Sequence, residues 1–147
     1  MSYTKLLYHI VFGTKDRIPY LNSAWRDDMH AYLGGETRGL KGTAFEVGGI
    51  EDHVHLLAHI PPTIALADFM SKLKANSSGW AKRKTGRPFV WQPGYGAFTV
   101  SESEAEKVKH YIRRQEEHHQ KVDYREEFLS LLHENAIEFE EQYLWTP

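Results

Sequence analysis

Asp52-His-Val-His-Leu-Leu-Ala-His-Ile60 is an apolar run that predicts a buried β-strand. Side chains alternate between the two faces of a strand, so His53 and His55 point the same way while Val54 points the other way. Burying an imidazole without a partner is costly. The pair therefore indicates either two satisfied structural histidines or two ligands of one shared metal ion.

A second pattern, Tyr111-Ile-Arg-Arg-Gln115, lies in a stretch of helix-forming residues from Ser103 to Gln120. Ser103, followed three residues later by Glu106, predicts a capping box at the start of this helix. Residues i and i+4 share one helix face, so Tyr111 and Gln115 should stand side by side. An amide oxygen can be a third ligand beside two imidazoles, and a phenol held beside the metal is a candidate nucleophile.

The order of the predicted elements is β-α-β-β-α-β, with further helices appended. Ser23 is the expected N-cap of the first helix, and Gly34-Gly35 its expected end. Strands are expected over residues 6–12, 45–49, 53–60, 89–92 and 97–100, and helices over 23–33, 64–83, 103–120 and 124–135. This order is typical of an α+β, ferredoxin-like (RRM-like) antiparallel sheet with helices on one face, which leaves the other face free for a site.

Composition predicts one domain, residues 1–147, with 41% apolar and 26% charged residues. The chain has no cysteine, which excludes disulfides, thiolate metal sites and cysteine nucleophiles. No apolar run is long enough to span a bilayer, and Met1-Ser-Tyr-Thr-Lys5 lacks a signal-peptide pattern. We therefore expect a cytoplasmic protein with no membrane partner.

Positive charge is concentrated in one stretch, although the net charge is −2. No acidic residue lies between Asp68 and Glu102. Aromatic residues are interleaved with the basic ones, a pattern expected where single-stranded nucleic acid binds, although the aromatics alone are better explained as core. The basic residues of this stretch are Lys72, Lys74, Lys82, Arg83, Lys84 and Arg87.

These motifs, in this order, resemble the single-tyrosine HUH transposases, in which U stands for a bulky apolar residue. These comprise the TnpA-type transposases of IS200-like insertion sequences and the REP-associated tyrosine transposases. The resemblance covers nearly the whole chain. The residues that carry it are Tyr8-His-Ile-Val-Phe12, Thr14-Lys-Asp-Arg17, Asp52-His-Val-His-Leu-Leu57, Pro61-Pro62, Phe69-Met-Ser-Lys-Leu-Lys74, Ser77-Ser78, Trp91-Gln-Pro-Gly-Tyr-Gly-Ala-Phe98 and Tyr111-Ile-x-x-Gln115-Glu-x-His-His119.

The resemblance implies the same ferredoxin-like fold and a specific chemistry. Tyr111 would be the catalytic nucleophile, and His53, His55 and Gln115 would bind Mg²⁺ or Mn²⁺. The activity would be metal-dependent cleavage of single-stranded DNA through a 5′-phosphotyrosine, followed by strand transfer.

The resemblance also implies partners. Family members recognise hairpins formed by single-stranded DNA at element ends, and Lys15 and Arg17 would contact this DNA together with the basic residues named above. A homodimer is implied as well, in which the tyrosine helix of one subunit can complete the metal site of the other.

Several residue roles stay open at this stage. His118 is an alternative or additional ligand to Gln115, and Tyr124 is a rival nucleophile that lacks an amide one turn later. Asp52 either contacts a ligand histidine or only starts the strand. His59 is expected to be structural, and neither His9 nor His119 is assigned a role.

Other functions compete with transposition. Histidine-triad nucleotide hydrolases use His-x-His-x-His, but here the third position is Leu57. A non-catalytic nucleic-acid-binding module would explain the basic stretch but not the joint occurrence of the histidine pair and the Tyr111–Gln115 pair. A domesticated endonuclease that acts on chromosomal REP-type repeats would share every motif.

Overall fold

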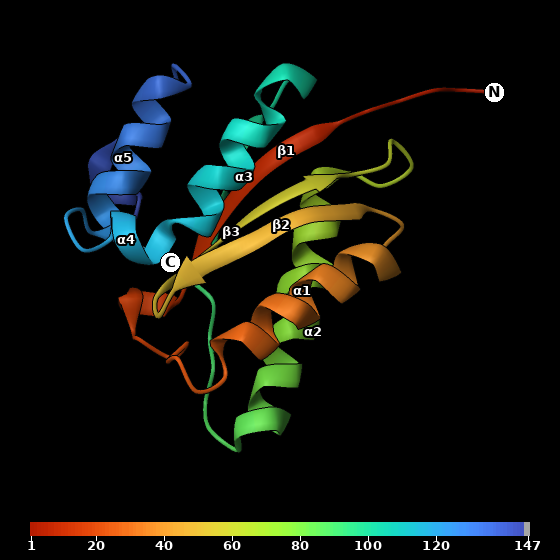
Figure 1. Ribbon diagram of the computed structural model, residues 1–147. Coiled ribbons are helices and arrows are strands. Elements are labelled where there is room, and N and C mark those ends of the chain that lie inside the picture. Colours follow the sequence, from red (N-terminus) through yellow and green to blue (C-terminus); the bar gives the residue numbers. More distant parts are fainter. Residues whose placement is uncertain (146–147) are drawn as a thin grey trace.

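The computed structural model describes residues 1–145 and contains a four-stranded antiparallel sheet (Figure 1). Its strands lie in the order β2-β3-β1-β4, with β1 and β3 in the centre. The strands are β1 (Leu7–Gly13), β2 (Thr43–Ile50), β3 (His53–His59) and β4 (Gly96–Thr99). This order confirms the α+β ferredoxin-like prediction. Residues 146–147, the end of the predicted domain, lie outside the described part of the chain.

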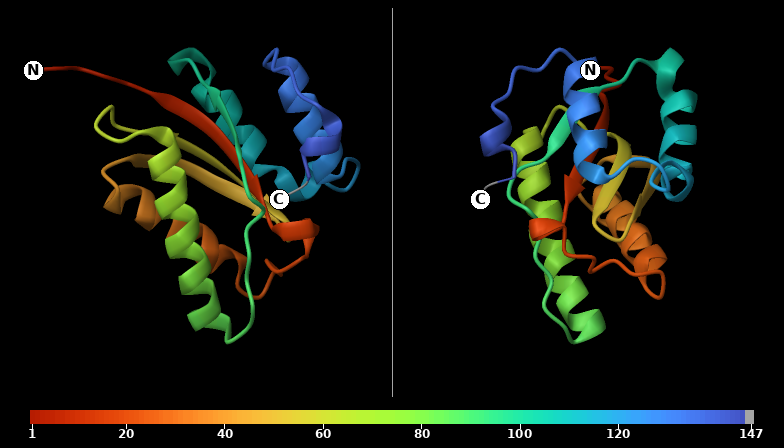
Figure 2. Two further views of the ribbon diagram at one scale, coloured as in Figure 1. Left: turned by 180° about the vertical axis from the view of Figure 1, so that it is seen from behind. Right: turned by 90° about the vertical axis from the view of Figure 1, so that its left-hand side faces the viewer.

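Helices cover both faces of the sheet (Figures 1 and 2). Two long helices, α1 (Arg26–Gly39) and α2 (Leu66–Thr85), lie on one face, as predicted. The other face is not free, because α3 (Ala105–Arg113), α4 (Gln115–His118) and α5 (Tyr124–Glu134) lie over it. Within residues 1–145, no helix combines the length and the apolar character needed to cross a bilayer.

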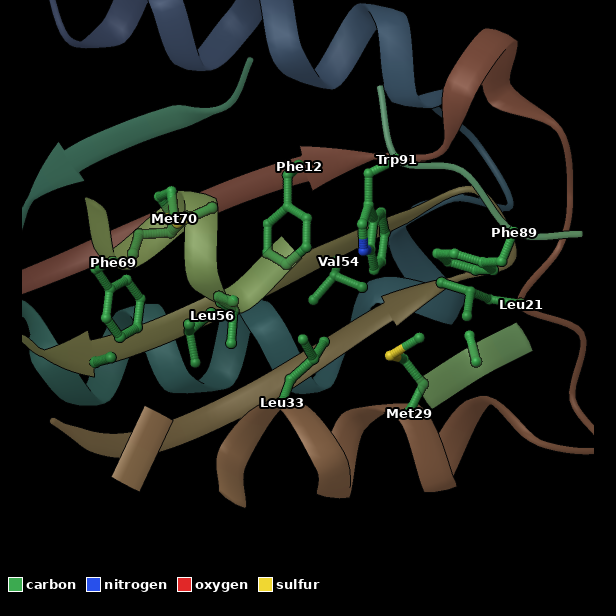
Figure 3. Close-up of a cluster of buried hydrophobic side chains, with 14 of the residues drawn as sticks. Phe12, Leu21, Met29, Leu33, Val54, Leu56, Phe69, Met70, Phe89 and Trp91 are labelled. Atoms are coloured by element: carbon green, nitrogen blue, oxygen red, sulfur yellow. The ribbon is translucent and has the colours of Figure 1, made fainter. Parts of the chain in front are cut away.

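The main hydrophobic core lies between the sheet and the α1–α2 layer (Figure 3). Alternation places Ile10 and Phe12 of β1 and Val54 and Leu56 of β3 on this face, each at most 1% exposed. Burying such a side chain fully stabilises the fold by about 1.5–3 kcal/mol relative to leaving it in water. The intervening residues of the same strands face α3, α4 and α5.

A second, smaller cluster lies on the other face of the sheet. Val11 of β1 and Phe98 of β4 pack there against Tyr124, Leu131 and Leu132 of α5. Asp123 caps α5, because its side chain accepts a hydrogen bond from the Glu126 amide at 2.9 Å. The cap and the apolar stripe together fix which face of α5 meets the sheet.

Some predicted boundaries are wrong for local reasons. The first helix does not stop at Gly34-Gly35 but continues to Gly39, and Ser23 does not cap it, because Trp25 holds the N-cap position. The predicted Ser103 capping box does not form either, since that helix begins after Glu104 without a side-chain cap. The α5 prediction, in contrast, is correct to within one residue.

The predicted strand over residues 89–92 is also wrong. This segment forms only one isolated bridge to the sheet, between Trp91 and Thr14. Pro88 and Pro93 flank it and have no amide hydrogen to donate to a ladder. Phe89 and Trp91 point into the core, at 1% and 6% exposed, whereas Val90 between them is 43% exposed.

His30 of α1 gives the stability a predictable pH dependence. Its Nε2 is buried and has no hydrogen-bond partner among residues 1–145, and burial lowers its pKa from 6.5 to about 4. Below pH 6.5 the unfolded chain therefore binds a proton that the folded protein does not, so stability falls towards pH 4. We expect His30→Leu to reduce the loss of stability between pH 7 and pH 5 by about 1 kcal/mol, or roughly 2–4 °C in Tm. Thermal unfolding of both proteins at both pH values measures this, and equal losses would contradict it.

Candidate active site

Strand β3 supplies two imidazoles to the face beneath α3, α4 and α5. The side chains of His53 and His55 are 0% exposed, as expected for the buried strand. The Nδ1 atom of His53 lies 2.8 Å from Asp52 Oδ1, so Asp52 contacts this histidine as well as preceding the strand. The Nδ1 atom of His55 lies 2.8 Å from Nε2 of His9 on the neighbouring strand β1. Both rings are thereby held with their Nε2 atoms towards the helices.

Tyr111 and Gln115 reach the same place although no continuous helix joins them. α3 ends at Arg113, and Arg114 has φ −97° and ψ 22°, outside the helical region, before α4 begins. The Tyr111 ring lies 5.6 Å from the His55 ring, centre to centre. The two side chains that the i, i+4 spacing paired are therefore brought together, but across a break in the helix.

Glu127 of α5 is the centre of the cluster. One of its carboxylate oxygens, Oε1, lies 2.9 Å from Nε2 of both His53 and His55. The other, Oε2, accepts hydrogen bonds from the Tyr111 hydroxyl and, at 3.0 Å, from the Gln115 amide. The Glu127 side chain is 1% exposed, so a buried carboxylate links the predicted nucleophile to the two strand histidines.

His119 is the third imidazole of the cluster. Its Nε2 lies 3.0 Å from Glu127 Oε1 and 3.0 Å from Gln115 Oε1. The neighbouring His118 is farther away: its Nε2 lies 3.4 Å from Glu127 Oε2 and has no hydrogen-bond partner in the described part of the chain. Of the two adjacent histidines, His119 is the one placed to act with the strand pair.

The pKa values of the sheet histidines follow from burial and from nearby carboxylates. Burial lowers the pKa of His55 to about 4. It also lowers the pKa of His9 to about 3, with the charge of His55 acting in the same direction. Burial acts on His53 too, but hydrogen bonds to Asp52 and Glu127 outweigh it and raise the pKa of that ring.

The Glu127 carboxylate is held in its charged form. Burial alone would raise its pKa, but hydrogen bonds with His119, His53 and His55 outweigh burial and hold the pKa well below its usual range. Burial raises the pKa of Tyr111, and the negative charge of Glu127 raises it further. In this arrangement the phenol stays protonated and donates a hydrogen bond to the carboxylate.

The residues present fit a divalent metal ion. His53, His55, His119 and Glu127 each offer one ligand atom, and these atoms lie within 4.8 Å of one another. Imidazole nitrogen and carboxylate oxygen are common protein ligands of first-row divalent metals. The cluster is buried and its histidines are oriented through their Nδ1 atoms, as in metal sites whose ligands are fixed by outer hydrogen bonds.

A cavity of about 460 Å³ lies beside the tyrosine. It is bounded by β4, α3 and α5, and both Tyr111 and Glu127 contribute to its wall. His53 and His55 do not line it. The cavity therefore gives a substrate group a place next to the phenol, on one side of the imidazole cluster.

The basic residues predicted to contact DNA do not surround this cluster. Lys72, Lys82, Arg83, Lys84 and Arg87 are exposed on α2 or just after it, beyond the opposite face of the sheet (Figure 1).

Lys74 has a local structural role, because its ammonium group donates to the carbonyl oxygens of Gln92 at 2.6 Å and Gly94 at 2.8 Å. Lys15 and Arg17 lie directly after β1, at the end of the sheet where Gly13 pairs with His53. DNA contact by these eight residues stays a prediction.

Three other side chains are placed clearly. His59 accepts a hydrogen bond from the Leu6 amide at 3.0 Å, which is the structural role expected for it. Tyr124, the rival nucleophile, is 5% exposed and stacks on His53 with ring centres 4.1 Å apart. Trp80 stacks on Tyr32 at 4.7 Å, so this aromatic of the basic stretch packs within the protein.

Glu127 and His119 were not identified from the sequence. A signal for Glu127 exists, because Tyr124, Glu127 and Leu131 have the i, i+3, i+7 spacing of one buried helix face. A lone carboxylate within such an apolar stripe is unusual and predicts a buried partner. His119 follows Gln115 by four residues, which is a weaker signal because such pairs are common on exposed helices.

Comparisons with known proteins relate the chain to transposases. The family model described as "Transposase IS200 like" matches residues 2–115. The transposase for insertion sequence element IS200 of Salmonella typhimurium is 32% identical over 119 residues, which cover 74% of this chain and 75% of that protein. The ISDra2 transposase TnpA of Deinococcus radiodurans is 31% identical over 120 residues, covering 76% and 84% of the two chains.

Solved structures share the fold. A crystal structure assigned as a transposase of Deinococcus radiodurans R1 has a TM-score of 0.64 at 26% identity, covering 78% of this chain and 93% of that one. The REP-associated tyrosine transposase bound to a REP hairpin has a TM-score of 0.62 at 14% identity, covering 83% and 73%, a likeness of fold alone. The sequence matches, with this fold, establish that the chain belongs to the IS200-like transposase family.

Proposed function

We propose that this transposase cuts and rejoins single-stranded DNA through a covalent bond to Tyr111, with the help of a divalent metal ion. The observation that carries the proposal is the shared carboxylate. Glu127 contacts both the Tyr111 hydroxyl and the Nε2 atoms of His53 and His55 within one chain. A nucleophile and a candidate metal centre are therefore joined by a single buried group.

The reaction balances without an external energy source. The Tyr111 oxygen attacks the scissile phosphorus as the bond to the 3′ oxygen breaks, which leaves a 5′-phosphotyrosine and a free 3′-hydroxyl. Glu127 orients the hydroxyl by accepting its hydrogen bond. The phenol proton passes to solvent as the oxygen attacks, and the leaving 3′ oxygen takes a proton from solvent. Another 3′-hydroxyl can attack the phosphotyrosine in reverse, which transfers the strand. Because the phosphotyrosine conserves the energy of the phosphodiester bond, this chemistry suits a transposase better than a degradative nuclease.

His53, His55 and Gln115 are the proposed metal ligands, and Mg²⁺ or Mn²⁺ is the proposed ion. Such an ion, when bound, would withdraw charge from the phosphate oxygens and align phosphorus for in-line attack. The Gln115 carbonyl oxygen supports this assignment, because it lies 3.0 Å from His53 Nε2. Asp52 and His9 orient the rings of His53 and His55 through contacts with their Nδ1 atoms.

The proposed substrate is single-stranded DNA with hairpin ends. The transposase solved with a REP hairpin has this fold, and the Salmonella relative is the transposase for an insertion sequence element. Lys15 and Arg17, beside the His53 end of the sheet, are the proposed contacts nearest to the chemistry. We further propose a homodimer that supplies one tyrosine for each of two cuts, although Tyr111 here meets the imidazoles of its own chain.

Covalent trapping tests the function directly. The protein is incubated with single-stranded DNA from the flanks of its own element and with Mn²⁺, then denatured and resolved by gel electrophoresis. A labelled DNA–protein adduct that survives denaturant and requires the metal is the expected result. Metal-dependent DNA binding without any adduct would favour the non-catalytic binding module instead.

Removing either strand histidine should remove metal-dependent cleavage. We expect His53→Ala and His55→Ala each to lower the cleavage rate at least about 100-fold. Loss of a residue that only hydrogen-bonds a metal ligand typically costs about 10–100-fold, and loss of the ligand itself should cost more. Single-turnover cleavage across a Mn²⁺ titration measures the effect. His59→Ala is the matched control, since this third histidine of the same strand bonds the Leu6 amide instead. Unchanged rates in the first two variants would refute the ligand assignment.

A further inference from the structure

Two histidines of the cluster face hydrogen-bond acceptors with both ring nitrogens. The Nδ1 atom of His53 lies 2.8 Å from the Asp52 carboxylate, and its Nε2 atom lies 2.9 Å from the Glu127 carboxylate. His119 repeats this pattern, with Nδ1 2.5 Å from the carbonyl oxygen of Val122 and Nε2 3.0 Å from Glu127 Oε1. A neutral imidazole carries one proton and can satisfy only one of two acceptors.

The Gln115 amide does not supply the missing hydrogens. Its NH₂ group donates to Glu127 Oε2, so its carbonyl oxygen faces the cluster, 3.0 Å from Nε2 of His53 and 3.0 Å from Nε2 of His119. The Nε2 atom of His55 also points to Glu127 Oε1, at 2.9 Å. Five lone-pair atoms, three nitrogens and two oxygens, therefore converge in a buried space.

Two arrangements satisfy these atoms. Either His53 and His119 are both imidazolium, with two buried positive rings converging on Glu127 Oε1, or a cation lies among neutral imidazoles. The second arrangement avoids two buried organic charges and gives every lone pair a partner. It also matches the outer hydrogen bonds, because a proton on Nδ1 leaves Nε2 free as a ligand.

We infer that the metal centre includes His119 and Glu127 as ligands, so that the segment after Gln115 completes a site with three imidazoles and a carboxylate. This inference rests on the proposed function and extends its ligand set. Both residues lie beyond residue 115, where the match to the family model ends, and the ligand set implied by the resemblance contains neither of them. α5 is then part of the catalytic centre and not only a cover for the sheet.

This ligand set also selects the metal. Mg²⁺ prefers six oxygen ligands in an octahedron, whereas imidazole nitrogen suits first-row transition metals. A centre with three imidazoles therefore binds Mn²⁺ and Co²⁺ more tightly than Mg²⁺. Glu127 has a second consequence, because its Oε2 holds the Tyr111 hydroxyl while Oε1 faces the imidazoles. Filling the centre fixes the carboxylate that positions the nucleophile.

Metal binding without DNA tests the inference separately from catalysis. The chelator-treated protein is titrated with Mn²⁺, Co²⁺ and Mg²⁺ by calorimetry, and the visible absorption of the Co²⁺ form reports the ligand number. We expect His119→Ala and Glu127→Gln each to weaken Mn²⁺ binding at least about 10-fold and to change the Co²⁺ spectrum. Matched controls are His110→Ala and Glu126→Gln, exposed residues that should bind Mn²⁺ like the wild type.

Protein stability gives a second readout, because an ion that binds only the folded state raises Tm. Mn²⁺ should raise the Tm of the wild type and controls more than that of the two ligand variants. If Glu127→Gln does not fold, the inference is tested by comparing the Mn²⁺ affinity and the Mn²⁺-induced rise in Tm of His119→Ala with those of His110→Ala.

Wild-type Mn²⁺ affinity in both ligand variants, with binding lost in His53→Ala, would overturn the inference and leave the proposed function standing. Mg²⁺ binding as tight as Mn²⁺ would overturn the selectivity. A wild-type protein that binds no divalent ion would overturn both the inference and the metal dependence of the proposed reaction.

Discussion

Tyr111→Phe is expected to form no covalent adduct with single-stranded DNA while binding the DNA and Mn²⁺ as the wild type does. The substitution removes only the hydroxyl oxygen that would attack phosphorus. The ring keeps its place against His55 and His9, at 5.6 and 6.0 Å between ring centres. Because Tyr111 is the proposed nucleophile, the adduct yield should fall by about 1,000-fold or more. Denaturing gel electrophoresis of labelled DNA measures the yield, and a filter-binding or anisotropy titration measures affinity.

Tyr124→Phe is the matched comparison for this variant. Tyr124 is buried against His53 and burial raises the pKa of its phenol, so it is poorly placed to act as a nucleophile. Adduct formation should survive its loss. An adduct that persists in Tyr111→Phe and disappears in Tyr124→Phe would move the nucleophile to α5.

Gly48→Ala is expected to reduce cleavage about 100-fold while leaving the main core folded. Gly48 of β2 stands opposite His55 in the sheet, and a Cβ atom there would lie 2.5 Å from the carbonyl oxygen of Ile112 in α3. A flexible side chain could rotate to relieve this clash, but a backbone carbonyl group in a helix cannot, so α3 must move away from the sheet. Ile112 adjoins Tyr111, and a displacement of about 1 Å at a reacting group can cost 100-fold in rate. Single-turnover cleavage and circular dichroism measure the two parts of this expectation.

Gly35→Ala is the control for that experiment. Gly35 lies within α1, where an added Cβ would come no closer than 4.0 Å to its nearest neighbour outside the local backbone. Alanine in a helix interior stabilises by up to about 1 kcal/mol relative to glycine, so activity should be kept and Tm should not fall. Full activity in Gly48→Ala would mean that the position of α3 is set elsewhere.

Much of the site could be predicted because it depends on short-range spacing. The alternation along β3 places His53 and His55 together whatever the rest of the chain does. The four-residue spacing brought Tyr111 near Gln115, although α3 ends between them. The order of the elements was sufficient to predict the ferredoxin-like sheet, since few topologies are compatible with that order.

The unpredicted part depends on long-range packing. Glu127 meets His53 and Tyr111 only because α5 packs on the sheet at one angle, and no local pattern gives that angle. The prediction of a free sheet face was wrong for the same reason, since the pattern of the appended helices does not show that α3, α4 and α5 pack over that face. The prediction of a strand over residues 89–92 was wrong because buried aromatics such as Phe89 and Trp91 occur equally in a strand and in a loop that packs on the core.

The sheet separates two hydrophobic clusters of unequal size, and this has a consequence for how substrate reaches the buried imidazoles. Cooperative units of a protein open independently when few apolar contacts join them. Lifting α5 would disrupt the small cluster around Val11 and Phe98 and the contacts of Glu127, and would leave the large cluster intact. Amide hydrogens of α5 should accordingly exchange with solvent well before those of β1 and β3. Such an opening would expose the buried imidazoles to solvent on one side while the other half of the molecule stays folded.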